Sequence, residues 1–312
     1  MYESLRAHCP RFRLWVLCMD VASFDSLRKL ALPDIVPIAL AELEAADPGL
    51  FATKSNRSTV EYYFTSTPCL PLFLLDYAPE IECLTYLDAD LFFFHDPSSV
   101  SDEMSDSSIA IIEHRFPPHL KRLEQAGRFN VGWLSFRRDD EGLACLREWR
   151  LQCLEWCYDV PEEGRYADQK YLDRWPSRFR KVAVLQHPGA NVAPWNVTNY
   201  RVSLRNGRPF VDDAPVLFFH FHGLKEVASG VYETGLGGYG ALASRVLTRE
   251  IYLPYIRALQ RISRELAIDG SPLAGRSRTD SATSRSFFRV WLDVLRGRYL
   301  LVWNGHVIAT GR

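Results

Sequence analysis

The sequence lacks an excess of charge of either sign. Its 312 residues include 37 lysines and arginines against 38 aspartates and glutamates, which gives a formal net charge of −1. A strongly basic surface, which non-specific binding to nucleic acid requires, is therefore not expected. No secretory signal opens the chain, and no apolar run is long enough to span a bilayer. These absences favour a cytoplasmic protein with no nucleic-acid partner.

The cysteines also lack a pairing pattern. An odd number of cysteines scattered through apolar segments is a poor disulfide framework and fits reduced thiols in a cytosolic protein. Cys153 and Cys157 share a helix face, but no Cys-x-x-Cys motif or Cys/His cluster accompanies them, so buried thiols are favoured over a zinc site. The seven cysteines are Cys9, Cys18, Cys69, Cys83, Cys145, Cys153 and Cys157.

What the sequence does contain is an alternation of strand-like and helix-like segments. The chain is 47% hydrophobic, enough for a sizeable core. Alternating strands and helices predict an α/β fold, with a mostly parallel central sheet and helices on both faces. Ligands of such sheets bind outside the carboxyl ends of the strands. The strand-like segments are 11–20, 81–90, 108–114, 129–136, 181–186 and 215–222, and the helix-like ones are 2–8, 23–30, 38–47, 139–157, 168–175 and 240–267.

The composition changes near the C-terminus. We expect one domain over residues 1–268 and a flexible linker over 269–286, which is rich in Gly, Ser and Arg. Residues 287–312 are expected to form a C-terminal amphipathic helix or tail. Its apolar and basic part, 287–303, suits a peripheral contact with the inner membrane, docking on a partner, or a helix packed back on the domain.

Two aspartates interrupt an apolar run in the segment LTYLDADLFFFHDP. Residues two apart in an extended chain point to one face, so Asp88 and Asp90 are expected to project together from the end of a strand. Two neighbouring carboxylates repel each other unless a cation or a proton lies between them. A divalent cation that also binds a diphosphate would meet this need, and hard oxygen ligands suit Mg²⁺ or Mn²⁺. The alternative is a loop in which both side chains face water.

A second strand-like segment, VLFFHFHG, carries two histidines. His220 and His222 would share one face of the strand, and the phenylalanines between them would share the other. An imidazole beside a carboxylate pair favours Mn²⁺ over Mg²⁺, because imidazole is a borderline nitrogen donor. Lys225 follows closely and could hold a phosphate as a point charge. In isolation, these histidines are better explained as structural groups than as metal ligands.

The order of five motifs resembles a known family. YLDADLFFF, FNVGWLSF, ADQKYL, APWN and HFHGLK follow one another as they do in retaining, metal-dependent glycosyltransferases of the GT-A fold, the group that includes glycogenin and bacterial lipopolysaccharide galactosyl- and glucosyltransferases. The resemblance covers roughly residues 2–225. It implies a nucleotide-diphospho-sugar transferase fold whose first strand is absent ahead of the helix at 2–8.

The resemblance also implies roles for individual residues. Asp88, Asp90 and His220 match the metal ligands, and the two aspartates also match donor contacts. Asp168 and Gln169 match a pair beside the anomeric carbon; read alone, Asp168 is more simply a helix N-cap. The remaining matches are Asn130 to the donor sugar, Lys225 to the diphosphate and Asn196 to the acceptor side of the cleft.

The implied activity is transfer of a sugar from a nucleotide-diphosphate sugar, with a UDP-sugar as the expected donor, to a glycan or glycolipid acceptor with retention of stereochemistry and with Mn²⁺ or Mg²⁺ as cofactor. The alternative is a degenerate sugar-nucleotide-binding protein without turnover. A phosphohydrolase of the Asp-x-Asp-x-Thr/Val type is disfavoured, because Phe92 occupies the Thr or Val position. The segment 235–240, GLGGYG, spells a dinucleotide motif but follows no clear strand, which favours a flexible connection or a loop that closes over substrate.

Overall fold

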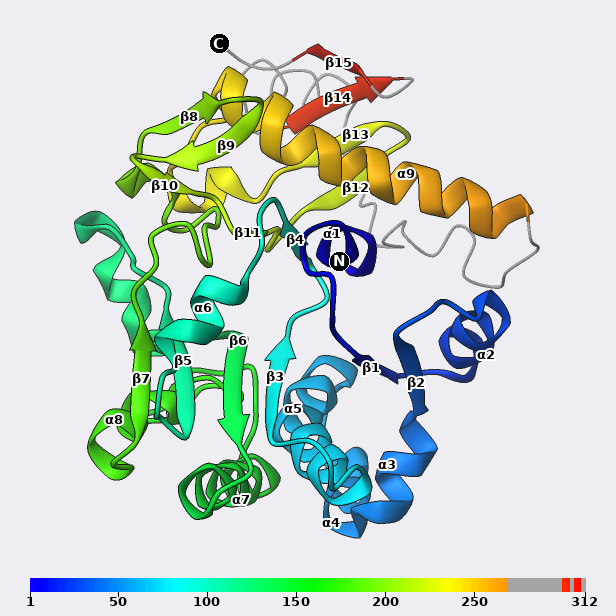
Figure 1. Cartoon of the computed structure of the whole chain (residues 1–312), viewed down its shortest axis with the longest axis vertical. Helices are drawn as coiled ribbons and strands as arrows, with labels where there is room; N and C mark the ends of the chain where they lie inside the picture. The colour runs from blue at the N-terminus through cyan, green and yellow to red at the C-terminus, as the bar shows by residue number, and fades with distance from the viewer. Residues whose placement is uncertain (269–298, 304–305, 310–312) are drawn as a thin grey trace. The chain divides into compact units, whose positions relative to one another are not determined.

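The computed structural model describes residues 1–268, 299–303 and 306–309 (Figure 1). The described chain divides into two compact units. Unit 1 comprises Met1–His8, Asp90–Pro97 and the described residues from Pro188 onward, and unit 2 comprises Cys9–Ala89 and Ser98–His187. The expectation of a single domain over residues 1–268 stays a prediction.

Unit 2 contains a four-stranded sheet in the order β3, β6, β5, β7. Its strands are β3 (Cys83–Leu87), β5 (Ile109–Glu113), β6 (Phe129–Arg137) and β7 (Val182–Leu185). β6 runs antiparallel to both β3 and β5, and only β5 and β7 pair in parallel. The α/β class is confirmed, but this sheet is mixed rather than mostly parallel. The physical reason is that no crossover helix of the kind a parallel pair needs lies between β5 and β6.

A separate parallel pair follows the N-terminal helix. Helix α1 (Tyr2–His8) is the first element, as expected, and β1 (Leu14–Cys18) pairs with β2 (Ile35–Ala39) across helix α2 (Val21–Leu30). The carboxylate of Asp20 accepts a hydrogen bond from the Ser23 N–H at 2.7 Å and so caps α2. No strand was predicted at 35–39, because this short apolar run leads directly into a helix.

Helices α5 (Thr59–Tyr77) and α7 (Asp140–Glu155) pack on each other and on the sheet of unit 2. Every residue of β6 except the last is buried, so both faces of this strand are covered. Phe136, Trp149 and Trp175 form an aromatic core whose ring centroids lie 5.4 to 6.3 Å apart. This packing holds the ends of β3 and β6 in place.

The described residues of unit 1 form three small sheets. β4 (Leu91–Phe93) pairs antiparallel with β11 (Phe218–His220). Helix α9 (Leu253–Ile268) follows a π-helical segment (Leu247–Tyr252), later than the expected start at 240. The other two sheets consist of β8 (Val202–Arg205), β9 (Arg208–Val211) and β10 (Ala214–Pro215), and of β12 (Lys225–Ala228), β13 (Val231–Glu233), β14 (Tyr299–Trp303) and β15 (His306–Ala309).

The C-terminal segment departs from expectation where it is described. Residues 299–303 form strand β14 rather than part of a helix over 287–312, because pairing with β13 buries Tyr299, Leu300 and Val302 almost completely. The expected linker at 269–286 and the first part of the amphipathic segment, 287–298, lie outside the described residues. Among the described helices, none combines the length and the apolar character that a membrane crossing needs.

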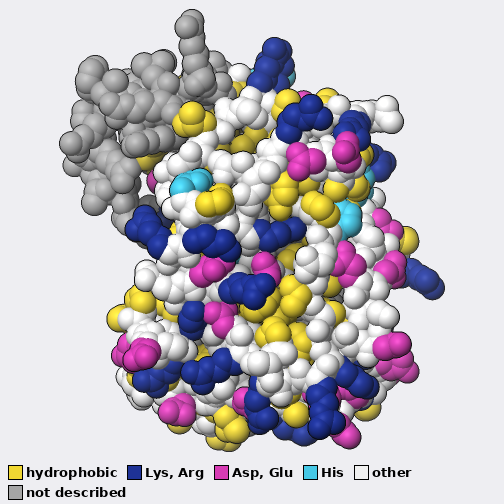
Figure 2. All heavy atoms as spheres, turned by 90° about the vertical axis from the view of Figure 1, so that its left-hand side faces the viewer, with side chains coloured by type: hydrophobic (Ala, Val, Ile, Leu, Met, Phe, Trp, Pro, Cys, Tyr) yellow, Lys and Arg dark blue, Asp and Glu magenta, His cyan; other side chains and the backbone are white. Residues whose placement is uncertain are grey.

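The face of the molecule in Figure 2 shows positive and negative side chains interspersed, as the balanced composition implies.

The remaining helical elements are short. The short elements are α3 (Leu40–Ala46), α4 (Pro48–Thr53), α6 (Ser98–Glu103), α8 (Trp175–Arg178) and 3-10 turns at Lys54–Asn56, Pro118–Ala126, Lys170–Arg174, Val197–Asn199 and Leu236–Tyr239.

The aromatic core yields a stability prediction. Replacing Trp149 with Ala should lower the free energy of unfolding by about 3–5 kcal/mol, because it leaves a large cavity between Phe136 and Trp175. On the same helix, Leu151 is 61% exposed, and Leu151→Ala should change that free energy by no more than about 0.5 kcal/mol. Urea unfolding followed by near-ultraviolet circular dichroism measures both, and equal effects would contradict this account of the core.

Candidate functional site

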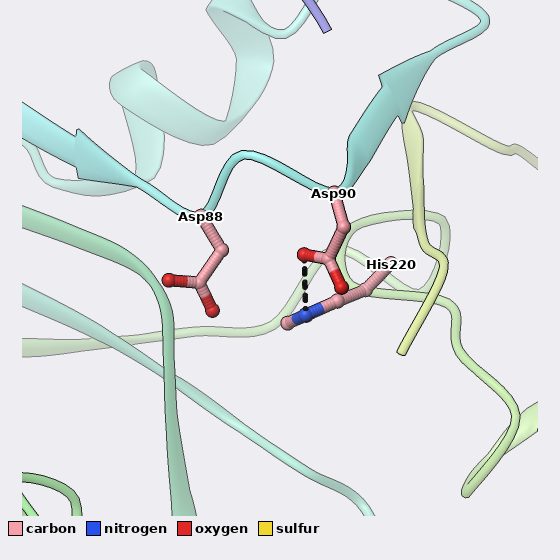
Figure 3. Close-up of side chains that lie close together, drawn as sticks. All are labelled: Asp88, Asp90 and His220. Carbon is pink, nitrogen blue, oxygen red and sulfur yellow. Dashed lines mark ion pairs between the residues drawn. The ribbon is translucent and has the colours of Figure 1, made fainter. Parts of the chain in front are cut away.

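The pairing of β4 with β11 places Asp90 beside His220. In this ladder His220 faces Leu91, and the Phe221 N–H donates a hydrogen bond to the Asp90 carbonyl at 3.0 Å. The side chains meet as well, with His220 Nε2 lying 3.0 Å from Asp90 Oδ1 (Figure 3). His220 is buried, while the Asp90 side chain is 41% exposed, so the pair has one side open to solvent.

Asp88 comes directly after β3. Its N–H donates to the Gly132 carbonyl at 3.2 Å, and the Tyr86 hydroxyl donates to Asp88 Oδ1 at 2.9 Å. The chain turns at residues 89–90 instead of continuing as an extended strand. Even so, one ligand atom from each of Asp88, Asp90 and His220 lies within 4.8 Å of the other two, as Figure 3 shows. The expected meeting of these three side chains is present.

The donor set of this cluster suits a divalent cation. Partial burial by itself raises the pKa of Asp90, but the hydrogen bond and positive charge of His220 outweigh burial and hold that pKa below its ordinary value. Asp90 is therefore an anion at neutral pH. Two carboxylates and one imidazole leave coordination positions for other oxygen ligands, and the imidazole favours a transition metal such as Mn²⁺.

The alternation predicted for residues 219–222 is present. Phe219 and Phe221 pack against Tyr252 in the core of unit 1. On the opposite face, His220 and His222 both contact the ring of Trp195, with centroid distances of 5.0 and 5.6 Å. The alternation therefore fixes which face of this segment carries the imidazoles, and His220 is the one that meets the acidic pair.

Asp168 lies buried in unit 2. Its carbonyl accepts a hydrogen bond from Trp149 Nε1 at 2.7 Å, and its side chain bonds to Thr67. Burial, together with the negative charge of Asp88, raises the pKa of Asp168 to about 7, against the lowering effect of the Thr67 bond. The 3-10 turn that follows begins at Lys170 and has Gln169 at its N-cap position, so Asp168 is not a helix cap. A perturbed carboxyl coupled to Asp88 is more typical of a functional site.

Gln169 is held by the segment that precedes β6. Its Nε2 donates to the Ala126 carbonyl at 3.1 Å, and its side chain lies against Gly127. Gly127 has a φ of +134°, and a Cβ there would lie 3.0 Å from Gln169 Cγ. Side chain and turn are therefore fitted to each other. Contact of Gln169 with an anomeric carbon stays a prediction.

His114, which the sequence analysis did not single out, is a hydrogen-bond partner of the predicted site residue Asn130. Its Nδ1–H donates to the Arg128 carbonyl at 3.2 Å, which leaves Nε2 to accept from Asn130 Nδ2 at 3.3 Å. Asn130 Oδ1 in turn accepts from the Gly132 N–H at 3.1 Å, and the Gly132 carbonyl accepts from Asp88. Asn130 is buried in this network. A lone histidine after β5 gives no sequence signal, because its partner lies on another strand.

Lys225 and Asn196 have different surroundings. Lys225 is exposed at the start of β12, and loss of water, the charge of His220 and the charge of Lys225 together lower the pKa of His222. The charge of Lys225 therefore acts on the histidine segment.

Asn196 is fully buried, where its Oδ1 accepts from the Ala193 N–H and its Nδ2 donates to the Asn191 carbonyl, both at 2.9 Å. These bonds assign Asn196 to shaping its own loop; contact with an acceptor stays a prediction.

Two Bacillus subtilis proteins resemble the chain in sequence over most of its length. The uncharacterized protein YfnD is 34% identical over 264 residues, which are 84% of each chain. The uncharacterized protein YfnF is 35% identical over 240 residues, or 73% of this chain and 77% of that one. The chain belongs to the family of YfnD and YfnF. No family model matches it.

Among solved structures, two glycosyltransferases resemble this YfnD/YfnF-family chain in part. One is described as involved in the glycosylation of the major capsid of PBCV-1, with a TM-score of 0.40 over 68% of this chain and 93% of its own. The other is mouse xyloside xylosyltransferase 1 in its apo form, with a TM-score of 0.41 over 68% and 84%. Both are 12% identical in sequence. At TM-scores this low, the two similarities do not indicate what the site does.

The raised pKa of Asp168 predicts a pH-dependent stability. The folded state keeps this proton up to about pH 7, whereas the unfolded chain loses it near the ordinary value of 3.8. Unfolding between these values releases a proton, so the free energy of unfolding should fall as pH rises, by a total on the order of 2–4 kcal/mol. Urea unfolding in a metal chelator measures this slope.

Asp168→Asn should remove most of the slope, because an amide does not titrate. Asp102→Asn, at an exposed position on α6, is the matched control and should keep it. Parallel profiles for the native protein and Asp168→Asn would contradict the assignment of the raised pKa.

Proposed function

We propose that the protein transfers a sugar from a nucleotide-diphosphate sugar, a UDP-sugar in the first instance, to a glycan or glycolipid acceptor. The observation that carries the proposal is the cluster of Asp88, Asp90 and His220, whose ligand atoms lie within 4.8 Å of one another. The order of the sequence motifs supports it independently, because each motif supplies one or two residues of such a site.

The number of ligands in the cluster explains why a diphosphate is the expected partner. Two carboxylates and one imidazole supply fewer oxygens than Mg²⁺ or Mn²⁺ prefers, and phosphate oxygens complete such a shell readily. When bound, the cation would offset the negative charge that develops on the departing diphosphate. Mn²⁺ fits better than Mg²⁺ because one donor is a nitrogen. Lys225, whose charge reaches His222, is assigned to the diphosphate.

The residues of unit 2 are assigned to the sugar. Asn130 is assigned to the donor sugar, with His114 fixing the orientation of its amide. Asp168 and Gln169 are assigned to the anomeric carbon, where Asp168, once it has lost its proton, would steady positive charge as the bond to the diphosphate breaks. The acceptor oxygen would bond to that carbon as the bond to the diphosphate breaks, and the acceptor's hydroxyl proton would pass to an oxygen of the departing diphosphate. Retention of configuration and a cytoplasmic location belong to the proposal and rest on the sequence alone.

The proposal is tested by following release of UDP from UDP-sugars in the presence and absence of Mn²⁺. Asp90→Asn should lower turnover by about 10²-fold or more, because it removes a charged metal ligand. Mn²⁺ affinity, measured by electron paramagnetic resonance, should fall in the same variant. Full metal-dependent turnover in Asp90→Asn would refute the proposed site.

Two further variants separate the roles. Gln169→Ala should lower turnover while Mn²⁺ affinity stays unchanged, because Gln169 is assigned to the sugar. Asp102→Asn, which removes an exposed carboxylate on α6, should change neither quantity. Binding of UDP and Mn²⁺ by the native protein without any sugar release would instead favour the second candidate, a sugar-nucleotide-binding protein without turnover.

A further inference from the structure

The glycine-rich loop 235–240 packs directly on the histidine segment. Gly235 has a φ of +76°, and a Cβ at this position would lie 2.4 Å from the His222 carbonyl oxygen. Gly223, with a φ of +77°, would bring its own Cβ to 3.4 Å from Gly235 Cα. Only glycines permit this close approach of two backbones. The loop is therefore a fitted part of unit 1 and not merely a flexible connection.

This loop brings the ring of Tyr239 to His222 and Trp195. The Tyr239 centroid lies 6.3 Å from that of His222 and 6.2 Å from that of Trp195, at interplanar angles of 62° and 72°. Trp195 is buried, Tyr239 is half-buried and His222 is exposed. The two accessible rings thus meet at a steep angle over a buried third ring. We call Trp195, His222 and Tyr239 the aromatic corner.

The aromatic corner lies beside a metal-site residue. The ring of His220 is 5.0 Å from Trp195 and 6.2 Å from His222, measured between centroids. The loop carrying Trp195 is fixed to β11, because the His220 N–H donates to the Val192 carbonyl at 2.8 Å. Asn196 closes the same loop through its two backbone hydrogen bonds. These hydrogen bonds therefore hold the aromatic corner in a fixed position relative to His220.

We propose that the aromatic corner binds the pyranose ring of the acceptor, an inference that rests on the proposed function. The C–H groups on one face of a pyranose carry partial positive charge and pack on the negative face of an aromatic ring, while imidazole and phenol groups bond to the hydroxyls. A nucleobase could stack in a similar way. However, a ribose and a phosphate separate it from the sugar-bearing end of the diphosphate, so it fits a place next to a metal ligand less well.

The test uses methyl glycosides of glucose, galactose and N-acetylglucosamine as acceptor probes, with UDP and Mg²⁺ present. Saturation-transfer NMR with irradiation of aromatic protons should label the ring protons on one face of at least one glycoside. Tyr239→Ala and Tyr239→Leu should each reduce that labelling by about fivefold or more, because neither keeps an aromatic face. Tyr239→Phe should retain most of it, since the ring is preserved.

Tyr77→Ala is the matched control, because it removes a tyrosine that is 62% exposed on α5 of unit 2. It should leave the labelling unchanged, and all Tyr239 variants should bind UDP with Mn²⁺ as tightly as the native protein. If UDP binds and no glycoside is labelled, or if Tyr239→Leu labels like the native protein, the inference is overturned while the proposed function stands. If UDP and metal do not bind at all, both fall together.

Discussion

The structure of the site depends on one pairing, that of Asp90 with His220. Two short strands, β4 and β11, come from parts of the chain more than a hundred residues apart and place this carboxylate and this imidazole 3.0 Å from each other. Asp88, two residues earlier, adds a second carboxylate that Tyr86 and the Gly132 carbonyl hold in position. Acidic groups held this close require a compensating positive charge, and that requirement gives the site its chemistry.

Periodicity predicted the parts of the site that are local in sequence. The two-residue spacing of His220 and His222 placed both imidazoles on one face, and the phenylalanines between them fill the core. The α/β class also followed from the alternation of segments. The antiparallel course of β6 and the role of His114 did not follow, because both depend on which distant strands pair, and strand partners leave little trace in a single sequence.

Burial of polar groups connects stability with the proposed chemistry. Asp168 loses water in the core of unit 2 and feels the charge of Asp88, so its carboxyl keeps a proton to unusually high pH. A group of this kind costs stability at neutral pH, which a fold retains most readily when the group has a function. Gly223 and Gly235 both have positive φ angles. These conformations permit the close backbone contact that places Tyr239 beside His222.

The central claim is that Asp88, Asp90 and His220 hold one divalent cation, and anomalous X-ray scattering from crystals grown with Mn²⁺ and UDP tests it most directly. The account predicts a single strong peak at the manganese absorption edge, about 2.0–2.3 Å from His220 Nε2 and from oxygens of both aspartates. A peak elsewhere, or none at this cluster while UDP is bound, would contradict the account.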